Sequence, residues 1–170
     1  MKLAGIEISP SINLHKKKLQ LNGAAVRSKF FVQTYVIALY AESPITNEDS
    51  AINSSIERDI RMIICTPLAT TDLVIDNIRN GIKDSVGSSH YAELKEPVEQ
   101  ITSTLKEIGI GYKDIVDIYL TSKGELLLYK NEKQEGKLKN GIGFAQALFE
   151  MYVGKRPKDK KIKQALLTGF

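Results

Sequence analysis

The alternation of hydrophobic and polar residues makes the first third of the chain rich in predicted strands. Residues 3–9 alternate around two isoleucines. Residues 12–15 and 19–21 alternate on either side of three lysines, as in a hairpin with a charged tip. Asn22-Gly23 is typical of a turn. Residues 30–41 then form the strongest predicted strand, apolar on both faces, so we expect other elements or a ligand cavity to cover each face.

The apolar spacing changes to a helical period in the middle of the chain. A short helix over residues 48–53, capped by Thr46 or Asn47, and a strand over residues 56–65 come first. Thr70 or Thr71 is then placed to cap a longer helix. The apolar stripe of this helix consists of Ile75, Ile78, Ile82 and Val86, and Gly87 ends it. A second helix is predicted over residues 97–108 and ends at Gly109.

The last third combines a hairpin with two further helices. Residues 115–120 and 125–129 flank a short turn, and a last short strand is predicted at Leu138. Helices are predicted over residues 141–153 and from a cap at Asp159 to Leu167. Strands and helices are therefore segregated along the chain, which predicts an α+β fold with a mostly antiparallel sheet and a single domain over residues 1–170.

Composition and motifs narrow the function classes. The chain has 170 residues, 42% of them hydrophobic, and its one cysteine, Cys65, excludes an internal disulfide framework. Cys65 lies in an apolar strand and is typical of an inert core thiol. With only His15 and His90, no cluster has metal-ligand spacing, and phosphate-binding and dinucleotide-binding motifs are missing from the sequence. We therefore expect no metal and no cofactor, and we place His90 in a loop.

Basic residues gather at 16–18 and at 155–163, within a net charge of +4. Nucleic-acid sites interleave basic residues with aromatic ones, which this pattern lacks, so we expect a solvated helix face and no nucleic-acid partner. No apolar run is long enough for stable membrane insertion. Two alternatives stay open for the C-terminal basic segment: an interaction module, and a weak contact with a membrane surface or a phosphate.

One segment carries a family resemblance. Residues 21–27 read L-x-G-A-x-x-R, and Phe31 to Tyr40 follow as F-x-x-x-x-x-x-x-x-Y. This order resembles the chalcone isomerase superfamily, and later segments such as 144–148, 153–157 and 163–167 resemble its bacterial chalcone-isomerase-like branch. The resemblance implies an open-faced β-sandwich: a large antiparallel sheet with helices packed on one face, and a ligand cleft between the sheet and the helices.

Residue by residue, the resemblance implies a changed site. Arg27 matches the arginine that stabilises an enolate in true chalcone isomerases, and Tyr35 takes the place of a threonine that polarises the ketone. Where the enzymes carry a tyrosine, an asparagine and a second threonine, this chain has Thr71, Ile78 and Met151. Most of the polar catalytic set is therefore missing.

In the fatty-acid-binding branch of the superfamily, an arginine and a tyrosine at positions matching Arg27 and Tyr35 hold the ligand carboxylate. We therefore expect binding of a fatty acid or similar apolar carboxylate, with little or no catalysis. Phe31, Ile37 and Leu39 share the strand parity of Tyr35 and would line an apolar cleft. The alternative is an isomerase or intramolecular lyase that acts on an enone, in which Arg27 stabilises the enolate and Tyr35 polarises the carbonyl or transfers a proton.

A shared site sets a geometric condition. On a straight strand Arg27 and Tyr35 would lie about 26 Å apart, at roughly 3.3 Å per residue. They can hold one anion only if the chain bends between Arg27 and Phe30.

The resemblance also bears on location, because bacterial relatives often carry an export leader. We expect a periplasmic protein whose leader has been removed, with the cytoplasm as the alternative. The oligomeric state is not indicated by the sequence.

Overall fold

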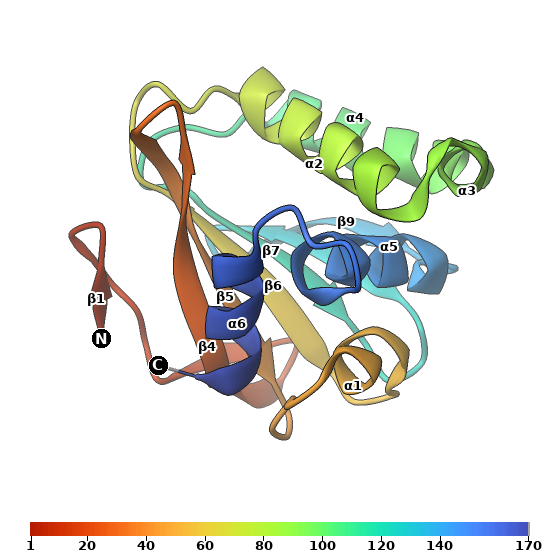
Figure 1. The fold of residues 1–170 in the computed structure, drawn as a ribbon, viewed down its shortest axis with the longest axis horizontal. Coiled ribbons are helices and arrows are strands. Elements are labelled where there is room, and N and C mark those ends of the chain that lie inside the picture. Colours follow the sequence, from red (N-terminus) through yellow and green to blue (C-terminus); the bar gives the residue numbers. More distant parts are fainter. Residues whose placement is uncertain (170) are drawn as a thin grey trace.

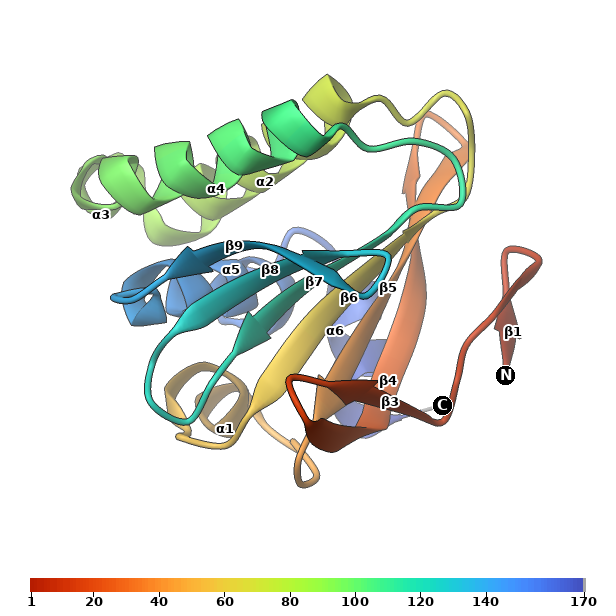
Figure 2. The same ribbon diagram turned by 180° about the vertical axis from the view of Figure 1, so that it is seen from behind.

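Seven strands form one antiparallel sheet whose spatial order follows the chain order, as the computed structural model of residues 1–169 shows (Figures 1 and 2). A small separate hairpin precedes them. The predicted α+β class with an antiparallel sheet is confirmed. The strands are β1 (Lys2–Leu3), β2 (Ile6–Glu7), β3 (Ser11–Leu14), β4 (Lys17–Lys29), β5 (Val32–Ala41), β6 (Arg58–Ile64), β7 (Ile115–Leu120), β8 (Leu126–Lys130) and β9 (Lys133–Leu138).

The helices pack against one face of this sheet (Figure 1). Thr70 caps the second of them, since its side chain accepts a hydrogen bond from the Leu73 amide at 3.2 Å. His90 lies in a short helix rather than in the predicted loop, because the Gly87 carbonyl accepts from the Tyr91 amide and starts a new helical turn. The helices are α1 (Glu48–Asn53), α2 (Thr71–Val86), α3 (Ser88–Glu93), α4 (Lys95–Ile108), α5 (Ile142–Val153) and α6 (Lys160–Thr168). Within residues 1–169 none of them is long and apolar enough to cross a membrane.

Strand β5 is covered on both faces from Thr34 onward, as its composition predicts. Tyr35, Ile37 and Leu39 belong to the core beneath the helices. The alternate residues of β5 belong to a second core on the opposite face, covered in part by residues 8–14. The sheet curls so far that the His15 ring, at the β3–β4 turn, lies 5.6 Å from the ring of Tyr119 on β7.

The reversal between β4 and β5 is not where the sequence predicts it. Asn22-Gly23 lies inside β4 as a bulge, where the register shifts between the pairs Leu21–Tyr40 and Gly23–Leu39. The chain turns instead at Phe30-Phe31, with φ angles of 49° and 65°. Hence β4 and β5 are two long paired strands that end in an aromatic turn.

The bulge is explained by the helix that rests on it. A Cβ added to Gly23 would lie 2.0 Å from the carbonyl oxygen of Ala165 in α6, so only glycine permits this approach. The Asn22 amide group donates to the carbonyl of Ile45 at 2.8 Å and to that of Leu166 at 2.6 Å. Asn22-Gly23 is thus the seat of α6 on the sheet rather than a turn.

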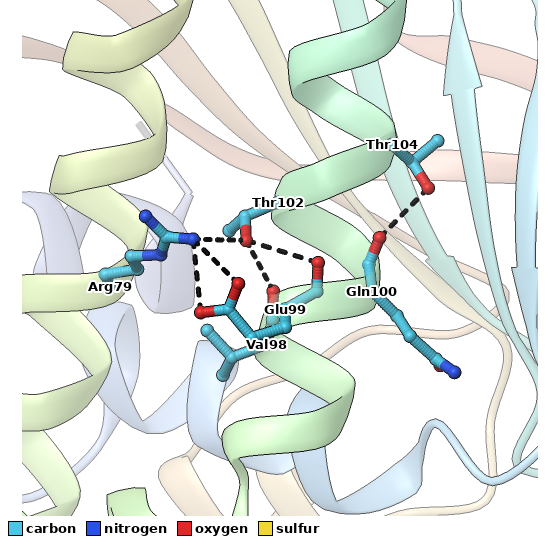
Figure 3. A network of polar contacts seen from close by, with 6 residues as sticks. All are labelled: Arg79, Val98, Glu99, Gln100, Thr102 and Thr104. Atoms are coloured by element: carbon cyan, nitrogen blue, oxygen red, sulfur yellow. Dashed lines mark hydrogen bonds and ion pairs between the residues drawn. The ribbon is translucent and has the colours of Figure 1, made fainter.

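Helices α2 and α4 are fastened to each other (Figure 3). The Arg79 guanidinium on α2 donates to both carboxylate oxygens of Glu99 at 3.2 Å and to the Thr102 hydroxyl at 3.0 Å, both on α4. The buried Thr102 hydroxyl itself donates to the Val98 carbonyl at 2.8 Å. The two helices therefore form one layer over the sheet.

Candidate ligand-binding site

The β4–β5 hairpin brings Arg27 and Tyr35 together. The two residues are direct cross-strand partners in the register. Opposite residues in an antiparallel pair point to the same face, with Cβ atoms about 4.5–5.5 Å apart. The geometric condition for a shared site is therefore met, although the bend falls at Phe30-Phe31, just beyond the predicted stretch.

A second tyrosine meets the first. The hydroxyl of Tyr152, near the end of α5, lies 3.2 Å from the hydroxyl of Tyr35, and both side chains are buried. Burial raises the pKa of Tyr35, and burial together with the neighbouring Tyr35 raises the pKa of Tyr152 well above its ordinary value. Both phenols therefore stay protonated at neutral pH and can donate hydrogen bonds to an anion or a carbonyl oxygen.

These side chains border a small cavity of about 10 Å³, which is room for about one water molecule. Strand β4, strand β5 and helices α2, α5 and α6 all contribute to its wall. In this conformation the site is closed to a larger ligand. The lining residues are Arg27, Tyr35, Asn77, Met151, Tyr152, Lys158, Asp159 and Ile162.

The charge around this cavity is positive. The Arg27 side chain is 16% exposed, and its Nη1 lies 3.9 Å from Asp159, a distance at the limit of an ion pair. The same carboxylate caps α6 by accepting from the Lys161 amide at 2.8 Å. Lys158 lies nearby, and burial and the charge of Arg27 lower its pKa. Two cations, Arg27 and Lys158, and one carboxylate, Asp159, therefore line the cavity, and this excess of positive charge favours a further anion.

The structure brings some of the predicted site residues to the cavity and leaves others in the core. Arg27, Tyr35 and Met151 line the cavity. Ile37, Leu39 and Ile78 are buried between the sheet and the helices but do not reach the cavity. They form the apolar surroundings of the site rather than its wall.

Two predicted residues lie elsewhere. Phe31 does not line a cleft: it occupies the β4–β5 turn with a positive φ, and its side chain is fully exposed. The strand parity assigned to it fails because the strand begins at Val32. Thr71 does not line the cavity either, since its hydroxyl donates to the Ile110 carbonyl at 3.2 Å and accepts from the Ile110 amide at 2.7 Å. It ties the start of α2 to the loop before β7.

Sequence reasoning did not assign Tyr152, Asn77, Lys158, Asp159 or Ile162 to the site. Tyr152 could have been found as an inward polar tip on an apolar helix, since its helical spacing turns it toward the core. Lys158 and Ile162 reach the cavity because α6 is seated on the bulge at Gly23. That long-range contact leaves no periodic signal along the chain.

The arrangement defines a class of protein: an antiparallel sheet with helices on one face, and an arginine and tyrosines between the layers. The sequence profile of the chalcone isomerase-like family matches residues 1–168, so this chain belongs to that family. Its fold is similar to that of a fatty-acid binding protein of Arabidopsis thaliana, with a TM-score of 0.74 and 18% identity over 97% of this chain and 93% of the other. A comparison with curated proteins found no match.

Proposed function

We propose that this protein binds a fatty acid or a similar apolar carboxylate between its sheet and its helices. The observation that carries the proposal is the placement of Arg27 directly opposite Tyr35 and beside Tyr152, with Asp159 as a distant carboxylate partner. The ligand carboxylate replaces Asp159 as the partner of Arg27 and accepts hydrogen bonds from the phenols. A guanidinium fork matches a carboxylate, and each charge-assisted bond contributes about 1.5–3 kcal/mol.

The acyl chain needs an opening that the closed cavity lacks. Met151 is the side chain that fills this space: a Cβ added to Gly81 on α2 would lie 2.0 Å from its sulfur. Methionine is unbranched and adapts its shape readily. Rotation of Met151, with a shift of the joined α2–α4 layer, exposes the apolar side chains of Ile37, Leu39 and Ile78 to the ligand. Each buried methylene then adds about 0.8 kcal/mol.

The family and the fold support this proposal. The chain belongs to the chalcone isomerase-like family, and the similar Arabidopsis thaliana protein is described as fatty-acid binding. The two positions that the resemblance implies for a carboxylate, Arg27 and Tyr35, are also the two that pair across the hairpin. Lys158 adds a second cation at the cavity wall.

The test is native mass spectrometry of the purified protein, followed by titration with palmitate. We expect the wild type to carry or take up the acid and Arg27→Ala to bind at least about tenfold more weakly, which corresponds to about 1.4 kcal/mol. Arg156→Ala is the matched control, because it removes an exposed guanidinium from the same basic region without touching the cavity wall. Its affinity should equal that of the wild type.

A wild type that takes up no palmitate, or an Arg27→Ala variant that binds as well as the wild type, contradicts the proposed head-group site. The enone alternative then becomes the working hypothesis. It predicts a slow change in chalcone absorbance that the wild type catalyses and that Arg27→Ala does not.

A further inference from the structure

Four large apolar side chains stand in solvent at one end of the sheet. Phe30 and Phe31 form the β4–β5 turn, Leu68 lies in the loop before α2, and Tyr112 lies in the loop before β7. Their exposed fractions range from 51% to 104%. We call these four residues the tip patch. Neither the core nor the cavity at Arg27 uses them.

The topology gathers the three loops of the tip patch. Strand β5 begins, β6 ends and β7 begins at this end of the sheet, because the three strands are antiparallel neighbours. Hydrogen bonds tie two of the loops to the neighbouring strands: the Cys65 amide donates to the Thr34 carbonyl in β5, and the Lys113 amide donates to the Ile64 carbonyl in β6, each at 3.0 Å. Figures 1 and 2 both show the β4–β5 turn beside the loop that leads into α2.

The β4–β5 turn consists of two residues that disfavour the backbone conformation it requires. Phe30 and Phe31 both have positive φ, a conformation typical of Asn-Gly in a two-residue hairpin turn. For other residues this conformation costs roughly 1–2 kcal/mol each. The rings recover nothing by burial, because they are exposed. Hairpin stability therefore does not explain two phenylalanines here.

Cations accompany the rings. The ammonium of Lys29 lies 5.8 Å from the centre of the Phe30 ring, and that of Lys113 lies 5.3 Å from the centre of the Tyr112 ring. Neither lysine has a carboxylate within ion-pair distance in residues 1–169. The carboxylate next to Lys113, that of Asp114, is paired with Lys130 at 3.2 Å. Two lysines without a carboxylate partner among residues 1–169 thus flank the tip patch.

We propose that the tip patch docks the protein on the surface of an anionic phospholipid bilayer. Exposed turns and loops that carry aromatic and apolar side chains can enter the interface of a bilayer without a complementary groove, and aromatic rings favour that depth. Lys29 and Lys113 complement the negative lipid headgroups. Arg27 lies in β4, three residues before Phe30, so docking places the part of β4 that borders the cavity near the lipid. Docking does not need a fatty acid in the cavity, so this proposal and the proposed function can fail separately.

The test is co-sedimentation of ligand-free protein with phosphatidylcholine–phosphatidylglycerol vesicles, with pure phosphatidylcholine vesicles as the uncharged comparison. We expect the wild type to bind the anionic vesicles, more weakly as salt increases. The double variant Phe30→Asn/Phe31→Gly should bind at least about tenfold more weakly, since it removes two apolar anchors. Its melting temperature should stay the same or rise, because Asn-Gly suits the turn.

The matched control is Ile142→Ser. Ile142 is also an exposed large apolar residue, but it lies near the β7–β8 turn, at the opposite end of β7 from the tip patch, since a Cβ added to Gly124 would be 3.8 Å from its side chain. This variant should bind vesicles like the wild type.

Three results would overturn the proposal: a wild type that stays in the supernatant with anionic vesicles, a double variant that sediments like the wild type, or an Ile142→Ser variant that loses binding equally. A concentration-dependent dimer that the double variant abolishes, without vesicle binding by the wild type, would assign the tip patch to a second copy of the chain instead.

Discussion

Two arginines on opposite faces of the sheet differ in whether the guanidinium is available to a ligand. Arg61, on β6, faces away from the helices and donates to both oxygens of Asp117 on β7, at 2.6 and 3.1 Å. Its side chain is 9% exposed and that of Asp117 is 0% exposed. Arg27, on the helix-covered face, has Asp159 at 3.9 Å. Arg61 is satisfied by its own chain, whereas Arg27 keeps its hydrogen-bonding capacity for another anion.

The carboxylates differ in the same way. On the Arg61 face a further acid, Asp59, is fully buried, and neither of its oxygens has a hydrogen-bond partner among the described residues. Burial and the neighbouring Asp117 raise its pKa well above the ordinary value. The Arg61 face holds two acids, Asp59 and Asp117, for one guanidinium. At the Arg27 face, two cations, Arg27 and Lys158, lie at the cavity with one carboxylate, Asp159. The first imbalance affects stability, and the second favours ligand binding.

The largest expected effect comes from making one substitution at both arginines. Arg61→Met should lower the free energy of unfolding by about 3–5 kcal/mol, because it leaves Asp117 buried without its partner. Arg27→Met should lower it by less than about 1 kcal/mol, since the weak, partly exposed pair with Asp159 contributes little. Urea denaturation measures both. Equal losses would show that Arg27 is as much a structural residue as Arg61.

The next effect concerns Asp59 and pH. Because the folded-state pKa is raised, the stability due to Asp59 is fully present below its unfolded pKa of about 3.9 and is lost as pH rises toward the folded value. Asp59→Asn should remove this loss. We expect the variant to exceed the wild type by at least about 1 kcal/mol near pH 8 and to approach it near pH 4.

The difference between the Asp59→Asn and wild-type unfolding curves at each pH isolates the contribution of Asp59 from those of the other acids. A difference that does not grow with pH would mean that Asp59 ionises normally in the folded protein.

The smallest effect is that of single hydroxyls. Tyr35→Phe should weaken palmitate binding by about three- to tenfold, the net contribution of one ordinary hydrogen bond, because the Tyr35 hydroxyl exchanges its contact with Tyr152 for the carboxylate. Tyr40→Phe is the counterpart on the other face, where the hydroxyl donates to the Ser9 carbonyl at 2.8 Å. It should cost about 1 kcal/mol of stability and leave the affinity for palmitate unchanged. Calorimetric titration with palmitate measures the affinity of both variants. An affinity that falls in Tyr40→Phe and not in Tyr35→Phe would place the ligand on the face of the sheet away from the helices.

Much of the fold could be predicted from the sequence because its signals are local. The apolar spacing of Ile75, Ile78 and Ile82 marks α2, and Asp159 caps α6 as expected. The strand through Tyr35 is apolar in both parities, and it is covered on both faces. Each of these signals reflects burial or capping within a few residues of chain.

The predictions from the sequence fail where tertiary contacts override the local preference of the residues. Asn22-Gly23 is an ordinary turn signal, yet it serves as the seat of α6. Phe30-Phe31 has the composition of a strand, yet it forms the turn. Arg27 and Tyr35 could be assigned to one site only through the family resemblance, whereas Lys158 depends on how α6 docks. Sheet register and helix seating are set by packing between distant segments, so no local pattern reports them.

The central claim is that Arg27 recognises the charged head group of an apolar ligand. The most direct measurement is a cycle of four affinities: laurate and dodecan-1-ol, each titrated into the wild type and into Arg27→Gln. The alcohol keeps the chain and loses the charge, so the cycle isolates the contact between the head group and Arg27. We predict that the wild type prefers laurate by at least about tenfold, or about 1.4 kcal/mol, and that Arg27→Gln loses this preference. An equal preference for laurate in both proteins would contradict the account.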